Sequence, residues 1–111
     1  MDRLWIFLKG GIAMLSQKSK CKFFMVANDI FEFKLKPRDF MVYCCLLRHQ
    51  DSEKHICFPS RKLISDECCI NRNTVDIAIK NLENTGLVKK VHRYRKDGTK
   101  TSNLYYVNDL L

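Results

Sequence analysis

No stretch of this 111-residue sequence is apolar for long enough to cross a membrane. The most hydrophobic segment, residues 4–15, is interrupted at positions 9–11 by a lysine and two glycines, and it falls short of the ~20 residues that a transmembrane helix needs. It also lacks the basic start and the small-residue cleavage site of a signal peptide, because Asp2 offsets Arg3. We therefore expect neither membrane insertion nor export.

The cysteines lack the spacing of a disulfide framework or of a structural metal site. The six are Cys21, Cys44, Cys45, Cys57, Cys68 and Cys69. Adjacent cysteines do not suit an ordinary bridge, and the pair at 44–45 lies in an apolar helical pattern, where a free cysteine acts as a small hydrophobe. This pattern predicts a reduced cytoplasmic protein with no metal and no cofactor. A redox- or metal-sensing regulator that uses the pair 44–45 or 68–69 stays open as an alternative.

Motifs of catalysis are missing as well. The sequence contains no phosphate-binding loop, no G-x-S-x-G and no H-E-x-x-H. His55 and Cys57 are the closest pairing of a histidine with a nucleophile. Since the three histidines, at 49, 55 and 92, are scattered, we interpret them as surface residues or as partners at the edge of the core. The sequence therefore predicts a protein that is not an enzyme.

Basic residues, by contrast, are abundant. Twenty Lys and Arg stand against 12 Asp and Glu, for a formal net charge of +8. Such a charge favours polyanionic partners, nucleic acid among them. The length is that of one domain, and 46% hydrophobic residues supply a core.

Residues 1–22 differ in pattern from the rest of the chain. Leu4, Leu8, Ile12 and Leu15 would align on one face of a helix, but the double glycine between them weakens any such helix. We expect an N-terminal extension over residues 1–22 that is either a marginal helix or poorly ordered. One domain over residues 23–111 follows it.

Within that domain, a first helix is predicted from Pro37 to about His49, because proline favours the first helical position and apolar residues recur at helical spacing. Asn28 is expected to cap a short helical turn before it. A brief strand over residues 55–58 follows and stops at Pro59. The aromatic residues of this half are expected in the core: Phe23, Phe24, Phe31, Phe33 and Phe40.

Two more helices and a hairpin complete the predicted order. Ser60 caps a second helix that ends within residues 68–69, and Asn71 caps a third that stops at Gly86. Strands over residues 87–95 and 101–107 flank the turn signal Asp97-Gly98, which predicts a hairpin. We expect its tyrosines to serve hairpin packing: Tyr94, Tyr105 and Tyr106.

The third helix and the hairpin carry side chains suited to nucleic acid. The helix opens with polar residues, and residues 89–100 hold six Lys and Arg against Asp97 alone. A helix fits the major groove, where its first residues meet base edges, and basic residues beside it displace counterions from phosphates.

Three segments resemble bacterial winged helix-turn-helix domains. They are Ser60-Arg61-Lys62-Leu63-Ile64, Ile70-Asn71-Arg72-Asn73-Thr74-Val75 and Ile79-Lys80-Asn81-Leu82-Glu83-Asn84-Thr85-Gly86-Leu87-Val88. The segment Thr101-Ser102-Asn103-Leu104-Tyr105 resembles the returning wing strand of a subgroup common in phage, plasmid and mobile-element proteins. The resemblance extends over residues 23–107 and implies an α+β fold, a three-helix core with a C-terminal β-hairpin wing.

The same resemblance implies a small transcriptional regulator that binds double-stranded DNA sequence-specifically and is compatible with a homodimer on DNA. Two alternatives stay open: the DNA-binding module of a plasmid- or phage-type replication initiation protein, and a winged helix that binds a protein partner. By position, it implies these DNA-binding residues: Ser60, Asn71, Arg72, Asn73, Thr74, Asp76, Ile77, Lys80, Lys89, Lys90, Arg93, Arg95, Lys96 and Lys100.

The sequence departs from this family at several positions. Cys69 stands where the family usually has glycine, so we predict a positive φ or a strained conformation there. Ser65 replaces a small, alanine-like residue, Asn71 replaces a serine, and Lys36 replaces a serine-type cap. Ile77 occupies a position that is often basic.

Overall fold

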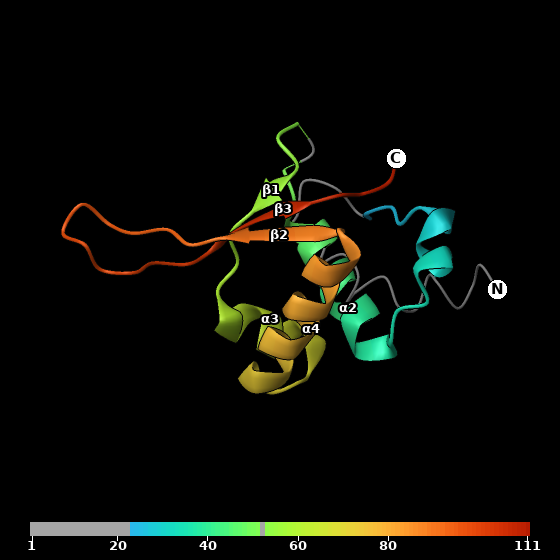
Figure 1. Ribbon diagram of the computed structural model, residues 1–111, viewed down its shortest axis with the longest axis horizontal. Coiled ribbons are helices and arrows are strands. Elements are labelled where there is room, and N and C mark those ends of the chain that lie inside the picture. The colour runs from blue at the N-terminus through green and yellow to red at the C-terminus, as the bar shows by residue number, and fades with distance from the viewer. Residues whose placement is uncertain (1–22, 52) are drawn as a thin grey trace, which may run out of the picture.

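The computed structural model of the protein describes residues 23–51 and 53–111, so the extension predicted for residues 1–22 lies outside the described residues. The elements follow in the order η1 (Asn28–Phe33), α2 (Pro37–His49), β1 (Ile56–Cys57), α3 (Arg61–Cys68), α4 (Arg72–Thr85), β2 (Val88–Val91) and β3 (Leu104–Val107). The α-helices lie on one side of a small sheet, and the loop between β2 and β3 projects away from the body (Figure 1).

The predicted helix caps are formed in α3 and α4. The Ser60 hydroxyl accepts a hydrogen bond from the Leu63 amide at 3.0 Å, and the Asn71 side-chain oxygen accepts one from the Thr74 amide at 2.8 Å. Gly86 ends α4 with a φ of 83°. The cap predicted at Asn28 is wrong, because Ala27 occupies the N-cap position of η1 and Asn28 is its first residue.

The turn between α3 and α4 has the geometry that the sequence predicts. Cys69 closes α3 in the left-handed conformation, with φ 58° and ψ 41°, so the positive φ predicted there is confirmed. Ser65 supports this turn twice. Its carbonyl accepts from the amides of Cys69 and Ile70, and its hydroxyl donates to the carbonyl of Ile70.

The core lies where the three α-helices meet the sheet. Its fully buried members include Tyr43 of α2, Val75 and Leu82 of α4, and Tyr105 of β3. Tyr43 also donates a hydrogen bond of 2.7 Å to the carbonyl of Asn108, which ties α2 to the chain beyond β3. Within residues 23–51 and 53–111, none of the helices combines the length and the apolar character that a membrane span requires.

The core placement predicted for the aromatic residues is wrong for three of the five. Phe23, Phe24 and Phe31 are 75%, 43% and 71% exposed. For Phe31 the reason is geometric, since the short helix η1 turns Ile30 inward and has no further buried position. Phe33 and Phe40 are partly buried against the core, as predicted.

The sheet has three antiparallel strands in the order β1-β3-β2. β1 joins the hairpin by pairing Ile56 with Tyr106 and Cys57 with Tyr105. The hairpin strands are shorter than predicted, because the residues beyond Val91 have left the core and are mostly exposed. Of its tyrosines, Tyr105 packs into the core, whereas Tyr94 and Tyr106 are 64% and 46% exposed.

Candidate nucleic-acid interface

The helix α4 presents two different faces. Its buried stripe, which includes Val75, Ile79 and Leu82, holds it against the core. Asn73, Ile77 and Lys80 are exposed and recur at helical spacing on the opposite face. Arg72 is also exposed, at the first residue of the helix. The exposed face therefore begins with side chains that can hydrogen-bond to base edges.

Three of the residues that the resemblance assigns to DNA also support helix starts. The side-chain oxygen of Asn71 accepts from both the amide and the hydroxyl of Thr74, at 2.8 and 2.9 Å. Ser60 does the same for α3 through the Leu63 amide. These contacts fix the residues at which α3 and α4 begin.

Asp76 is held by an arginine that is not among the DNA-binding residues expected from the sequence. Arg61, the first residue of α3, donates from Nε and Nη2 to the two carboxylate oxygens at 2.9 and 2.7 Å. Both side chains are about half exposed, at 45% and 52%. The pair neutralises a carboxylate that would otherwise repel phosphate. Arg61 lies within the motif that begins at Ser60, but a partner 15 residues away has no local signal in the sequence.

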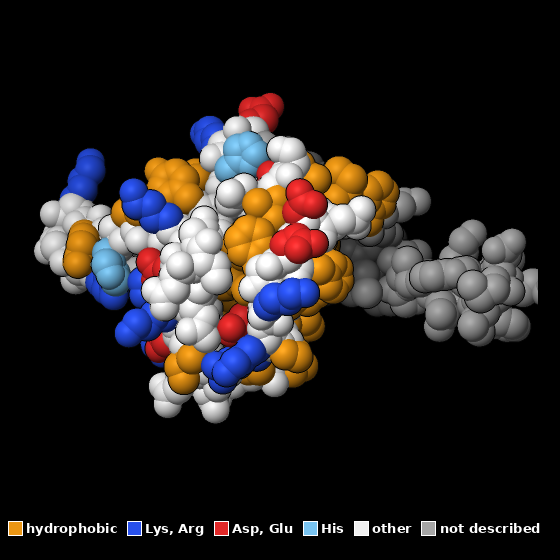
Figure 2. Space-filling model, turned by 45° about the vertical axis from the view of Figure 1, so that its right-hand side comes forward, with side chains coloured by type: hydrophobic (Ala, Val, Ile, Leu, Met, Phe, Trp, Pro, Cys, Tyr) orange, Lys and Arg blue, Asp and Glu red, His pale blue; other side chains and the backbone are white. Residues whose placement is uncertain are grey.

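The wing, residues 92–103 between β2 and β3, carries most of the predicted backbone contacts. Arg95, Lys96 and Lys100 are exposed there, as is Lys89 in β2, while Lys90 is half-buried. Figure 2 shows Lys and Arg side chains gathered at the end of the molecule that carries the wing, on the left of the view.

The acidic residue of the wing serves its turn. The Asp97 carboxylate accepts from the amide and the hydroxyl of Thr99 at 3.0 and 2.7 Å, and these hydrogen bonds lower the pKa of Asp97. Gly98 follows with a φ of 89°, which a residue with a β-carbon rarely adopts. The carboxylate thus shapes the tip of a surface that is otherwise strongly basic.

Arg93 differs from the other wing cations because it folds back onto the body. Its Nε donates to the carbonyl of Ser102 at 2.8 Å, and its guanidinium lies 4.8 Å from the centre of the Phe58 ring. Phe58 follows β1, so this contact joins the base of the wing to the chain before α3. Arg93 therefore has a structural role beside the DNA contact expected of it.

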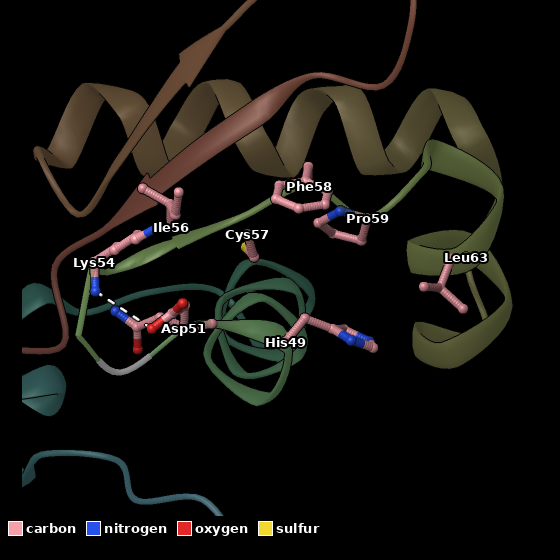
Figure 3. Close-up of a pocket in the computed structure, with 9 residues that line it drawn as sticks. His49, Asp51, Lys54, Ile56, Cys57, Phe58, Pro59 and Leu63 are labelled. Carbon is pink, nitrogen blue, oxygen red and sulfur yellow. Dashed lines mark hydrogen bonds between the residues drawn. The ribbon is translucent and has the colours of Figure 1, made fainter. Parts of the chain in front are cut away.

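A groove lies between the C-terminal end of α2, β1 and the start of α3 (Figure 3). His49, Phe58 and Leu63 line it, together with Asp51 and Lys54. The Asp51 carboxylate accepts from the amides of Glu53 and Lys54, which lowers the pKa of Asp51. This carboxylate makes the groove a poorer surface for phosphate than the wing.

The arrangement is that of a winged helix-turn-helix, a class of domain that binds DNA: α3, a tight turn and α4, followed by a β-hairpin wing. A family model described as a helix-turn-helix domain matches residues 34–88, the part of the chain that contains α2, α3 and α4.

Among solved structures, the chain is similar to a possible transcriptional regulator from Methanosarcina mazei Go1. The two are 16% identical with a TM-score of 0.53, and the match covers 68% of this chain and 58% of that one. At this identity the likeness concerns the fold alone. No curated protein sequence is significantly similar to this chain.

Proposed function

We propose that this protein is a small transcriptional regulator that binds double-stranded DNA sequence-specifically. One observation carries the proposal. A helix-turn-helix domain exposes the polar start of its second helix, α4, and continues directly into a wing rich in exposed lysine and arginine. The similar structure from Methanosarcina mazei is that of a possible transcriptional regulator, which is in keeping with this function.

The proposed roles follow from chemistry and position. Arg72 and Asn73, at the start of α4, are side chains that can pair bidentately with guanine and adenine. Ile77, one turn further on, can contact a thymine methyl group. Lys80 and the wing cations bind phosphates, which strengthens binding to any sequence but specifies none.

The test is an affinity panel over single-base variants of a site selected from random oligonucleotides. We expect Arg72→Ala and Asn73→Ala each to relax the preference at one or two base positions by about 1–3 kcal/mol, with weak non-specific binding retained. Asn84→Ala, exposed on the last turn of α4, is the matched control and should leave the preference intact. An unchanged preference in both test variants would show that α4 does not recognise the bases.

A winged helix that binds a protein partner is the second candidate, and the 48% exposure of Ile77 on the outer face of α4 is the observation that favours it. Salt dependence separates the two functions. If the protein binds DNA, the logarithm of the affinity falls linearly and steeply with the logarithm of the salt concentration. The affinity of an apolar contact with a protein partner has no such steep fall. A replication initiation module would behave like the regulator in this assay, and only its target site would tell the two apart.

A further inference from the structure

The packing of α2 against α3 brings together three kinds of side chain that bind metal ions. Cys45 and His49 lie four residues apart on α2 and so share one face of the helix. Glu67 lies in the last turn of α3. The ligand atoms of these three residues all lie within 4.8 Å of one another. Adjacent cysteines drew attention in the sequence, but the structure pairs Cys45 with residues that no local motif connects to it.

The distances suit a single small cation. His49 Nε2 lies 2.9 and 3.0 Å from the two carboxylate oxygens of Glu67, and Cys45 Sγ lies 3.4 Å from Oε1. Zinc bonds of about 2.0–2.3 Å in a tetrahedron place neighbouring ligand atoms roughly 3.3–3.8 Å apart. An ion could therefore be accepted by small side-chain rotations, with the helices in place.

Access and charge are also compatible with an ion. A small cavity lined by Phe24, Met41 and Cys68, among others, opens beside Cys45 and Glu67. Arg48 is the competing cation, with its Nη1 3.3 Å from Glu67 Oε1. Its side chain is 47% exposed and can turn toward water, or it can keep one carboxylate oxygen while the metal takes the other.

We propose that Cys45, His49 and Glu67 bind one zinc ion, with a fourth position open to the cavity between α2 and α3. Binding replaces the hydrogen bonds among the three side chains by bonds to zinc and releases the thiol proton of Cys45 to solvent. Zinc would link α2 to the end of α3, immediately before the turn that sets the direction of α4. This site is independent of the proposed DNA binding and can be tested without DNA.

The test is a titration of the reduced, metal-free full-length protein with Co²⁺, which reports tetrahedral thiolate ligation by its absorption. We expect one equivalent to bind, with a thiolate-to-cobalt band that Zn²⁺ abolishes by displacement. Cys45→Ser should remove the band, and His49→Gln should weaken binding by about tenfold or more. The matched controls Cys69→Ser and His92→Gln replace an exposed cysteine and an exposed histidine elsewhere and should bind as the unsubstituted protein does.

Two further measurements guard against misfolding of a variant. Circular dichroism shows whether each variant keeps its helices, and Glu67→Gln, which keeps the side-chain shape, replaces Cys45→Ser if that variant unfolds. Zinc should raise the melting temperature of the unsubstituted protein but not of Glu67→Gln. The proposal would be overturned by absence of the thiolate band in the unsubstituted protein, by a band that survives in folded Cys45→Ser, or by an equal rise in melting temperature with zinc in Glu67→Gln. The three side chains would then be only a hydrogen-bonded link.

Discussion

Cys69 shows how this chain forms a tight helix-turn-helix turn with a residue other than glycine. A left-handed conformation brings a β-carbon close to the backbone and costs a non-glycine residue about 1–2 kcal/mol. Ser65 offsets part of that cost, because its carbonyl accepts two amides of the turn and its hydroxyl donates to the carbonyl of Ile70. The serine at 65 and the cysteine at 69 are therefore parts of one local arrangement.

Cys69→Gly should leave the free energy of unfolding unchanged or raise it by roughly 0.5–1 kcal/mol, since glycine adopts this conformation without strain. Urea denaturation monitored by circular dichroism measures the change. Cys69→Ala is the control, because it removes the thiol but keeps the β-carbon, and it should give no such gain. A clear loss of stability in the glycine variant would contradict the strain at this turn.

We expect DNA binding to become tighter when the Arg61–Asp76 ion pair is broken by removal of the Asp76 charge. Asp76→Asn removes a negative charge from the outer face of α4 and frees the Arg61 guanidinium for a phosphate. We expect tighter binding to all sequences and a salt dependence steeper by about 0.9 in logarithmic slope. Salt titrations of the two proteins on one DNA measure it.

Asp66→Asn is the matched control for this substitution, because Asp66 accepts from Lys62 at 3.0 Å within α3 and is similarly exposed. Asp66→Asn changes the net charge by the same amount as Asp76→Asn. An equal effect from both substitutions would mean that bulk charge, rather than the position of Asp76, governs the result.

At the scale of the elements, α2 is fastened to the end of the sheet by a buried phenol. Burial raises the pKa of Tyr43 to about 12, with a smaller contribution from the nearby Asp109 carboxylate. In the unfolded chain a tyrosine ionises near pH 10. Between these two values only the unfolded chain has released the proton, so stability must fall as pH rises from about 10 to 12.

Tyr43→Phe should lower the free energy of unfolding at neutral pH by about 1 kcal/mol, because the carbonyl of Asn108 loses its donor. The variant should also lose less stability than the unsubstituted protein between pH 10 and pH 12, since phenylalanine has no proton to release. Urea denaturation at both ends of this range checks the result. Tyr106→Phe, half exposed on β3, should change neither quantity.

For the whole molecule, the concentration of lysine and arginine on β2 and the wing leads to a prediction about how the protein binds DNA. Replacing Lys89, Lys90, Arg95 and Lys96 by alanine should weaken binding to all sequences about equally, because phosphate contacts carry no base information. The logarithmic salt dependence should become shallower by up to about 3.6, since each phosphate that is no longer neutralised lowers the slope by about 0.9.

The double variant Lys36→Ala with Lys54→Ala serves as the control, because it removes two exposed charges outside α4, β2 and the wing. Its effect for each charge removed should be much smaller. Unchanged affinity of this fourfold variant at low salt would contradict the binding of phosphates by β2 and the wing.

Features that depend on neighbours along the chain could be predicted from the amino-acid sequence alone. Pro37, Ser60, Asn71 and Gly86 set the ends of the three α-helices, because first-turn geometry, capping and a positive φ involve residues only a few positions apart. The left-handed conformation of Cys69 was predictable on a different ground, because helix-turn-helix domains usually have glycine at this position. The polar start of α4 and the basic hairpin could likewise be found from the sequence, since each is a continuous segment.

Contacts between residues far apart in the sequence depended instead on the tertiary structure. It paired β1 with β3, which turned a predicted hairpin into a three-stranded sheet. It joined Arg61 to Asp76, placed Arg93 over Phe58, and gathered Cys45, His49 and Glu67. It also left Phe23 and Phe31 exposed, although both are apolar. Such contacts depend on how elements pack around one core, and in a single sequence that packing leaves no periodicity or spacing from which they could be predicted.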